Sequence, residues 1–311
     1  MEKNYLYFHD VFAAGEEHLH GIKNTIVEIK TPYQFIQLVE SSFFGKMLII
    51  DGDVQSSVKD EYIYHESLVH PAMLLHPNPK NIILLGGGEG ATLREVLKHK
   101  NIKKVVMVDI DKDGIELAKK YLGEWHKGSF ENPKTTLINT DAKKFIESQV
   151  ASNSTDIIIS DLTEPFEAGP SYKLFTKEFF GLLFDKLTED GIFVLQASML
   201  RSITYRMHRA IRNTLMQIFP VVRSYYVYVP SFDTTWSFVL ASKKYDPKTV
   251  SIEEIDEKIQ KRIEGELKFY DGESHMRVFS LPKDIKKILA KNKEEIITDS
   301  RPLSLPRKEN I

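Results

Sequence analysis

The chain has 311 residues, carries a net charge of −2 and contains no cysteine. Its length allows a full hydrophobic core in one large or two modest domains. The small net charge gives no bulk attraction to nucleic acid or to an anionic membrane, so we expect neither as a partner. The absence of cysteine excludes disulfides, thiolate zinc sites and cysteine nucleophiles, and we expect the chain to be compatible with the cytoplasm.

The first 75 residues predict a small N-terminal β domain and a linking helix. Residues 1–10 lack the apolar core of a signal sequence. Turn signals at Thr31-Pro32 and Asp51-Gly52 separate short alternating stretches that are typical of strands. Residues 60–75 predict a helix, and we expect a domain boundary near residue 76. The four predicted strands are 25–30, 34–40, 46–50 and 54–58.

From residue 82 strands and helices alternate, which is typical of a Rossmann-like, doubly wound, mostly parallel α/β sheet. Two later strands, 221–229 and 235–241, predict a terminal antiparallel hairpin, as in methyltransferase-like folds that bind sulfonium nucleosides. The predicted catalytic domain is 76–245, and 246–311 is a charge-rich helical extension of it. The other strands are 82–85, 105–108, 136–138, 156–159 and 192–196, with helices beginning near 92, 113, 176 and 204.

An apolar strand runs into a glycine loop with a carboxylate at its tip, in Ile82–Gly90 (IILLGGGEG). Such a loop before a helix brings backbone amides close to a nucleotide-like ligand. Glu89 opposes a phosphate or carboxylate there, because two like charges about 4 Å apart repel by about 4 kcal/mol at an effective dielectric constant near 20. The loop therefore favours a cationic ligand.

More acids follow the next strands, whose carboxyl ends meet at one edge of a parallel sheet. Asp109 is placed to bind ribose hydroxyls or to cap the next helix. Asp141 can accept a purine amino group or be a solvated turn residue, and Asp161 and Glu164 reach the same edge. Unpaired buried carboxylates are costly, and the spacing of these acids is not that of a metal site. Polycationic organic ligands fit such a pocket better than a metal does.

The segment Asp60–Glu66 (DEYIYHE) lies at the predicted domain junction. Tyr64 and His65 can face the crevice at the sheet edge. They can equally be a core tyrosine and a buried interdomain histidine.

Taken together, these motifs resemble the polyamine aminopropyltransferases, the family of spermidine and thermospermine synthases, from about Thr31 to Pro282. The glycine loop alone is not specific, whereas the whole set is. The motifs are PYQ (32–34), LIIDGDVQ (48–55), DEYIYHE (60–66), HPNP (76–79), GGGEG (86–90), LREV (93–96), VDID (108–111), DA (141–142), DLTEP (161–165), GP (169–170) and FSLP (279–282).

The resemblance implies a transferase that moves the aminopropyl group of decarboxylated S-adenosylmethionine to an amine and releases 5′-methylthioadenosine. It also implies a cytoplasmic homodimer or homotetramer without metal or cofactor. Asp161 matches the catalytic acid of the family, and the proton can reach it through Tyr64. The implied donor-binding residues are Gln34, Glu89, Asp109, Asp141, Ala142 and Pro170. The implied amine-binding residues are Gln55, Tyr64, His65, Glu89, Asp161 and Glu164.

The chain departs from the family pattern at the catalytic turn, Asp161–Glu164, which reads DLTE where spermidine synthases usually carry Asp-Ser-Ser-Asp. The loop Pro230–Trp236 looks like that of thermospermine synthases and broad-specificity thermophilic members, so putrescine, spermidine, agmatine and diaminopropane all stay open as acceptors. Trp236 either contacts the acceptor or packs the hairpin. Residues 167–172 are a candidate lid beside the catalytic turn.

Three other functions compete with aminopropyl transfer as explanations of these motifs. An S-adenosylmethionine methyltransferase shares the fold, but Glu89 would repel the carboxylate of its donor. A nicotinamide dehydrogenase meets the same objection through its pyrophosphate. A non-catalytic polyamine-binding protein would keep the pocket, and the presence of Asp161 argues against it.

Overall fold

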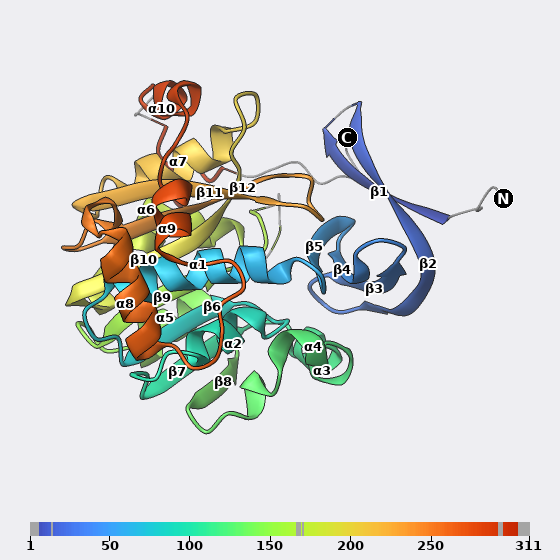
Figure 1. Cartoon of the computed structure of the whole chain (residues 1–311), viewed down its shortest axis with the longest axis horizontal. Helices are drawn as coiled ribbons and strands as arrows, with labels where there is room; N and C mark the ends of the chain where they lie inside the picture. Colours follow the sequence, from blue (N-terminus) through green and yellow to red (C-terminus); the bar gives the residue numbers. More distant parts are fainter. Residues whose placement is uncertain (1–5, 14, 166–168, 170, 292–294, 304–311) are drawn as a thin grey trace.

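The computed structural model describes residues 6–13, 15–165, 169, 171–291 and 295–303, and Figure 1 shows their strands in two sheets. The smaller sheet is antiparallel and follows chain order. Between its last two strands, Asp51 and Gly52 have φ of 50° and 83°, which suits the predicted two-residue turn. Its strands are β1 (Leu6–Ala13), β2 (Glu16–Lys30), β3 (Phe35–Ser41), β4 (Gly45–Ile50) and β5 (Asp53–Ser57).

The first hairpin of this sheet is the part that the sequence analysis misses. The strand predicted at 25–30 is only the end of the 15-residue strand β2, and β1 is not predicted at all. The β1 sequence, LYFHDVFA, mixes aromatic and charged residues without a clean alternation. A periodicity of two, which is the main sequence signal of a strand, is therefore weak there.

The larger sheet has seven strands in the order β11-β12-β10-β9-β6-β7-β8. Neighbouring strands from β10 to β8 are parallel, and β12 runs antiparallel to both β10 and β11. The predicted fold class and terminal hairpin are confirmed. The strands are β6 (Asn81–Gly86), β7 (Lys104–Asp109), β8 (Thr135–Asn139), β9 (Thr155–Asp161), β10 (Leu187–Met199), β11 (Val221–Val229) and β12 (Thr234–Ser242).

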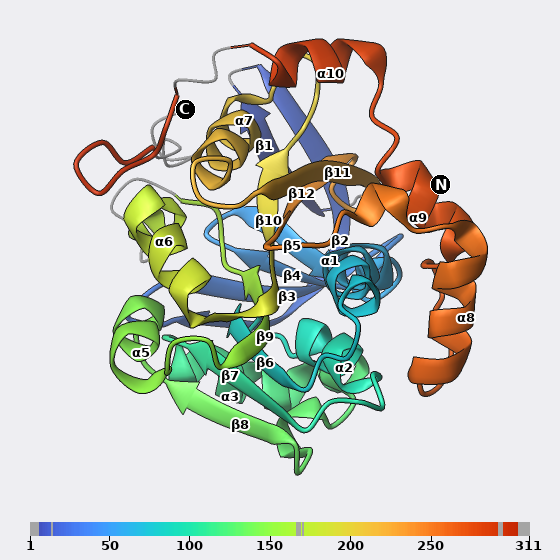
Figure 2. The same ribbon diagram turned by 90° about the vertical axis from the view of Figure 1, so that its left-hand side faces the viewer.

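Helices cover both faces of the larger sheet, as Figure 2 shows. None of the helices in the described part of the chain combines the length and apolar character needed to cross a membrane. One face carries α1 (Glu61–Leu75), α2 (Ala91–Leu97), α3 (Lys112–Tyr121), α4 (Gly123–His126), α8 (Ile252–Arg262) and α9 (Gly272–Val278). The other carries α5 (Ala142–Gln149), α6 (Lys177–Lys186) and α7 (Arg206–Leu215). A further helix, α10 (Lys283–Leu289), and three 3-10 turns, 129–131, 172–175 and 247–249, complete the described elements.

The two-sided burial explains the apolar run before the glycine loop. Ile82 and Leu84 of β6 belong to the cluster on the α1 side, whereas Ile83 and Leu85 belong to the cluster on the α6 side. Successive residues of a strand point to opposite faces, so a strand covered on both faces is apolar at every position. The run therefore places β6 in the middle of the sheet and Glu89 just beyond its carboxyl end.

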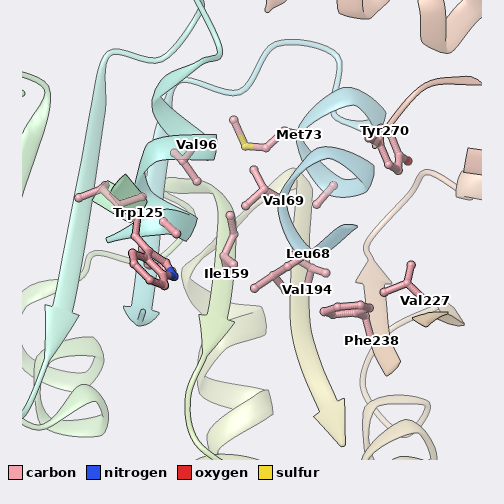
Figure 3. Packing of buried hydrophobic residues seen from close by; sticks show 14 of the residues in the cluster. Leu68, Val69, Met73, Val96, Trp125, Ile159, Val194, Val227, Phe238 and Tyr270 are labelled. Atoms are coloured by element: carbon pink, nitrogen blue, oxygen red, sulfur yellow. The ribbon is translucent and has the colours of Figure 1, made fainter. Parts of the chain in front are cut away.

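Helix α1 supplies much of the core on its face. Figure 3 shows Leu68 and Met73 of α1 in the same cluster as Ile159 and Val194 of the sheet. All four are completely buried. The division of the chain into domains 1–75, 76–245 and 246–311 stays a prediction.

A buried carboxylate attaches the segment between α8 and α9 to α1. Glu66 is completely buried and accepts hydrogen bonds from the backbone N–H groups of Lys268, Phe269 and Tyr270, at 2.8, 2.8 and 3.0 Å. A carboxylate that accepts several N–H groups is well suited to burial, because its lone pairs are used. Glu66 thus holds the C-terminal helices against the sheet.

Replacing this carboxylate should destabilise the fold. We expect Glu66→Gln to lower the free energy of unfolding by about 1–3 kcal/mol, because the amide places donors opposite the backbone donors. Urea denaturation measures this change. As a control, Glu257→Gln removes only an exposed ion pair with Lys261 and should change stability by less than about 0.5 kcal/mol. Equal effects of the two substitutions would contradict the role of Glu66.

Candidate active site

A cavity of about 580 Å³ opens at the carboxyl ends of the parallel strands, with one wall from the smaller sheet and another from β12. The strand register pairs Gly86 with Asp161 and Asp109 with Asn139, so acids from separate segments reach one edge. The site residues predicted from the sequence come together here. Those that line the cavity are Gln34, Gln55, Tyr64, His65, Glu89, Asp109, Asp141, Ala142, Asp161, Glu164 and Trp236.

Pro170, the remaining predicted donor-binding residue, lies outside the described residues, as do 167 and 168 of the predicted lid. Two cavity walls are not predicted from the sequence. Residues 10–12 of β1 form one, and residues 203–207 after β10 contribute to the other. Within the described ranges no group of three or more His, Asp or Glu side chains is arranged to hold a metal ion.

The glycine loop lies directly against the two acids that follow β7 and β9. Gly86 and Gly87 both have φ of 77°, and the N–H of Gly87 donates to the carbonyl oxygen of Asp161 at 2.9 Å. A Cβ on Gly86 would stand 2.4 Å from that carbonyl oxygen, and one on Gly88 would stand 3.1 Å from Oδ2 of Asp109. Only glycine permits this close approach of loop and acids.

Asp161 is held by a hydroxyl on each of its oxygens. Tyr64 donates to Oδ1 at 2.7 Å and Thr92 donates to Oδ2 at 2.5 Å. Burial raises the pKa of Tyr64 well above its usual value, and the charge of Asp161 raises it further, so Tyr64 stays a donor. Each carboxylate oxygen has a second lone pair for a ligand. Thr92 escapes the sequence analysis, because a threonine in the first turn of a helix carries no distinguishing pattern.

Asp109 and Asp111 have different roles. Asp111, not Asp109, caps the helix that follows β7. Oδ1 of Asp111 accepts from the N–H of Gly114 at the start of α3, and Oδ2 accepts from Nε2 of Gln34 at 2.7 Å. Asp109 accepts from the N–H of Asp111 at 2.8 Å. Burial raises the pKa of Asp109 to about 6. Gln34 and Asp111 thereby join the two sheets, and Asp109 stays in the cavity wall.

Asp141 is also a helix cap, since its Oδ1 accepts from the N–H of Lys144 at 2.8 Å at the start of α5. It lines the cavity together with Ala142. Trp236 packs the hairpin as one alternative predicted, and its contact with the acceptor stays a prediction. Its ring packs edge-on against Phe232, with centroids 5.2 Å apart, and it lines the cavity.

His65 and Glu89 form a buried ion pair rather than two separate wall residues. Nε2 of His65 lies 2.5 Å from Oε1 of Glu89, and Nδ1 lies 2.8 Å from Oε2 of Glu61. Burial lowers the pKa of His65, but the two carboxylates outweigh it and raise the pKa to about 10. Burial also raises the pKa of Glu89, against the effect of His65. The tip of the glycine loop is therefore an acid paired with an imidazolium.

Comparisons with known proteins identify the family. Residues 61–254 match the family model described as the spermine/spermidine synthase domain, and residues 7–57 match the spermidine synthase tetramerisation domain. The chain belongs to the spermine/spermidine synthase family. It is accordingly a transferase.

Related proteins cover nearly the whole chain. The polyamine aminopropyltransferases of the thermophilic archaea Sulfurisphaera tokodaii and Saccharolobus solfataricus are 48% and 49% identical to it, over 94% of this chain and 95% of each relative. A spermidine synthase in complex with the transition-state analogue AdoDATO has a TM-score of 0.85 and 32% identity, covering 93% of this chain and 96% of that one. Spermidine synthase from Thermotoga maritima gives 0.84 and 32%, over 93% and 95%. The family fold thus extends over both sheets.

The close contact between the glycine loop and Asp161 can be tested by substitution. We expect Gly86→Ala to cost about 1–3 kcal/mol of stability beyond backbone strain, because its Cβ meets rigid backbone. Gly128→Ala is the matched control, since its φ is 79° but nothing lies within 4 Å of the added Cβ. Denaturation of both variants separates the two effects. Equal destabilisation would show that only the positive φ matters.

Proposed function

We propose that the chain transfers the aminopropyl group of decarboxylated S-adenosylmethionine to a diamine or polyamine and releases 5′-methylthioadenosine. The observation that carries this proposal is a buried acid, Glu89, at the tip of the glycine loop in the same cavity as Asp161. The decarboxylated donor has no carboxylate to be repelled there and offers an ammonium instead. S-adenosylmethionine itself would bring two like charges together.

We propose that the donor lies along the carboxyl ends of β6, β7 and β8. Glu89 binds its ammonium group, Asp109 accepts the ribose hydroxyls, and Asp141 accepts the adenine amino group. With a pKa of about 6, Asp109 is ionised at neutral pH, and the hydrogen bond from the N–H of Asp111 fixes its Oδ1. Gln34, Ala142 and Pro170 complete the proposed donor site.

In the proposed reaction Asp161 accepts a proton from the attacking amine. An alkylamine has a pKa near 10, so it is protonated at neutral pH and cannot attack until that proton leaves. The nitrogen lone pair then forms a bond to the methylene carbon on sulfur. The carbon–sulfur bond breaks with its electron pair going to sulfur, and the sulfonium becomes a neutral thioether. Because the donor carries its own leaving group, we propose that no metal or cofactor takes part.

We propose putrescine as the preferred acceptor, with spermidine, agmatine and diaminopropane as competitors. The likeness to spermidine synthases supports putrescine, whereas the Pro230–Trp236 loop supports a broader choice. Tyr64 is already bonded to Asp161, so an amine held beside it would stand close to the proton acceptor. The proposed amine site consists of Gln55, Tyr64, His65, Glu89, Asp161 and Glu164.

We further propose that the enzyme is a homodimer or homotetramer and works in the cytoplasm. Except for Leu6, the hairpin β1–β2 lies within the match to the tetramerisation domain. It exposes Leu6, Tyr7 and Leu19, with 74%, 51% and 53% of their surface accessible. Apolar side chains gathered on one element are typical of an interface between subunits.

Product analysis tests the proposed reaction and identifies the acceptor. The purified protein is incubated with decarboxylated S-adenosylmethionine and equal amounts of putrescine, spermidine, agmatine and diaminopropane, and the products are identified by mass spectrometry. We expect methylthioadenosine together with spermidine as the dominant amine. Transfer to a different amine would correct the acceptor, and nucleoside binding without transfer to any of the four would overturn the reaction.

The role of Asp161 has its own test. We expect Asp161→Asn to lower kcat by about a hundredfold or more, because the amide cannot accept the proton. Binding of methylthioadenosine, followed by calorimetry, should be largely unchanged. The matched control is Asp156→Asn at the other end of β9, where Oδ2 accepts from the N–H groups of Lys80 and Asn81 and Oδ1 accepts from the hydroxyl of Thr188. Near-normal turnover of Asp161→Asn would exclude this residue as the base.

A further inference from the structure

A row of buried charged side chains begins at the cavity and continues between α1 and α2. Glu89 contacts His65, His65 contacts Glu61, and Glu61 accepts from both terminal nitrogens of Arg94 at 2.9 and 3.1 Å. Nε of Arg94 then donates to Glu95 at 2.7 Å. The exposed fractions of these side chains are 1–10%. The charges alternate in sign at each contact, so each group has a partner of opposite charge.

The contacts of His65 match its charged form. Both ring nitrogens face carboxylate oxygens, and an ionised carboxylate only accepts, so beside two ionised carboxylates each nitrogen carries a hydrogen. Nδ1 also lies 2.7 Å from the backbone carbonyl oxygen of Glu61, another acceptor. The charged groups that face His65 are Glu61 on its own helix and Glu89 on the glycine loop, and Asp161 on β9 acts on Glu89. His65 is therefore an imidazolium between two carboxylates.

Glu61 and Arg94 stand behind this histidine rather than at the cavity. Among the described residues that line the cavity, neither Glu61 nor Arg94 occurs. Arg94 holds Glu61 through a two-pronged contact, which fixes a carboxylate in both position and charge. Arg94 is itself fixed by Glu95 and by the carbonyl oxygen of Trp125. The contacts from this pair reach Glu89 through His65, and the charge of Glu61 also acts directly on Glu89, where it raises the pKa of that acid.

We propose that Glu61 and Arg94 are positioning residues that hold His65 as a charged donor to one oxygen of Glu89, so that the other oxygen is presented to the ammonium of the donor substrate. This inference rests on the proposed function, because it takes decarboxylated S-adenosylmethionine as the ligand of Glu89. A charge-assisted hydrogen bond is roughly twice as strong as a neutral one. Loss of the charge on His65 would loosen Glu89 and favour its protonation in the buried site.

NMR titration of the His65 ring in the full-length, ligand-free protein tests the first part of the proposal. The signal is assigned by its loss in His65→Asn. The unmodified ring should stay protonated from about pH 6 to 9, since it loses its proton only as the pH rises through about 10. In Glu61→Gln one carboxylate is gone, and the pKa should fall below about 8. An imidazolium that persists unchanged in Glu61→Gln would overturn the inference.

Binding and kinetics at pH 8 test the second part. For Glu61→Gln we expect the Kd and KM of decarboxylated S-adenosylmethionine to rise about tenfold, the usual size for weakening one hydrogen bond to a charged group. The Kd of methylthioadenosine should stay the same, because it has no ammonium for Glu89. The kcat should change by less than about threefold, since Asp161, Tyr64 and Thr92 keep their contacts. Arg94→Lys keeps the charge but loses the two-pronged contact, and its effect should have the same direction and be smaller.

Glu66→Gln is the matched control, because Glu66 lies on the same helix directly after His65, is also buried and binds backbone N–H groups instead. It should destabilise the fold without moving the His65 titration or the donor Kd. Equal changes in Glu61→Gln and Glu66→Gln, or an equal loss of methylthioadenosine affinity, would reduce Glu61 to a structural role. Failure of the unmodified enzyme to transfer aminopropyl groups would instead overturn the proposed function, while the NMR result would stand by itself.

Discussion

Buried negative charge is the constraint on which the rest of the site depends. Glu89, Asp109 and Asp161 share one cavity, and an isolated ionised carboxylate is very unfavourable in such a setting. Each acid has a different kind of partner: an imidazolium for Glu89, a backbone N–H for Asp109 and two hydroxyls for Asp161. Of the three acids, only Glu89 has a fully charged partner, the imidazolium of His65. Glu89 is also the acid that we propose binds the ammonium group of the donor.

Helix α1 supplies partners for two of these buried acids, Glu89 and Asp161. Residues three and four positions apart lie on the same side of a helix, so Glu61 lies beside Tyr64 and His65, the two residues of α1 that line the cavity. Glu66 follows directly and turns to the segment before α9. A single helix thus fixes Asp161 through Tyr64, fixes Glu89 through His65, and anchors the C-terminal helices. This explains why a helix of 15 residues can have several buried charged groups and still form part of the core.

The sequence predicts those features whose cause is local. The apolar run of β6 follows from burial on both faces, and the strand-end acids follow from the geometry of a parallel sheet. Contacts between distant segments leave no such pattern: Gln34 meets Asp111 across 77 positions, and Thr92 meets Asp161 across 69. For the same reason the sequence could not decide which acid after β7 caps the helix. The hairpin β1–β2 is missed because its mixed composition hides the strand periodicity.

The partner of Glu89 also bears on how the enzyme would reject S-adenosylmethionine. Repulsion of a carboxylate requires Glu89 to be ionised before the ligand arrives, yet burial alone pushes this acid towards the protonated form. A protonated Glu89 would repel nothing and could even donate a hydrogen bond to the unwanted carboxylate. The imidazolium of His65 opposes that protonation while the site is empty. Discrimination between the two nucleosides then depends on the charges behind the cavity, at Glu61 and Arg94, as much as on the acid inside it.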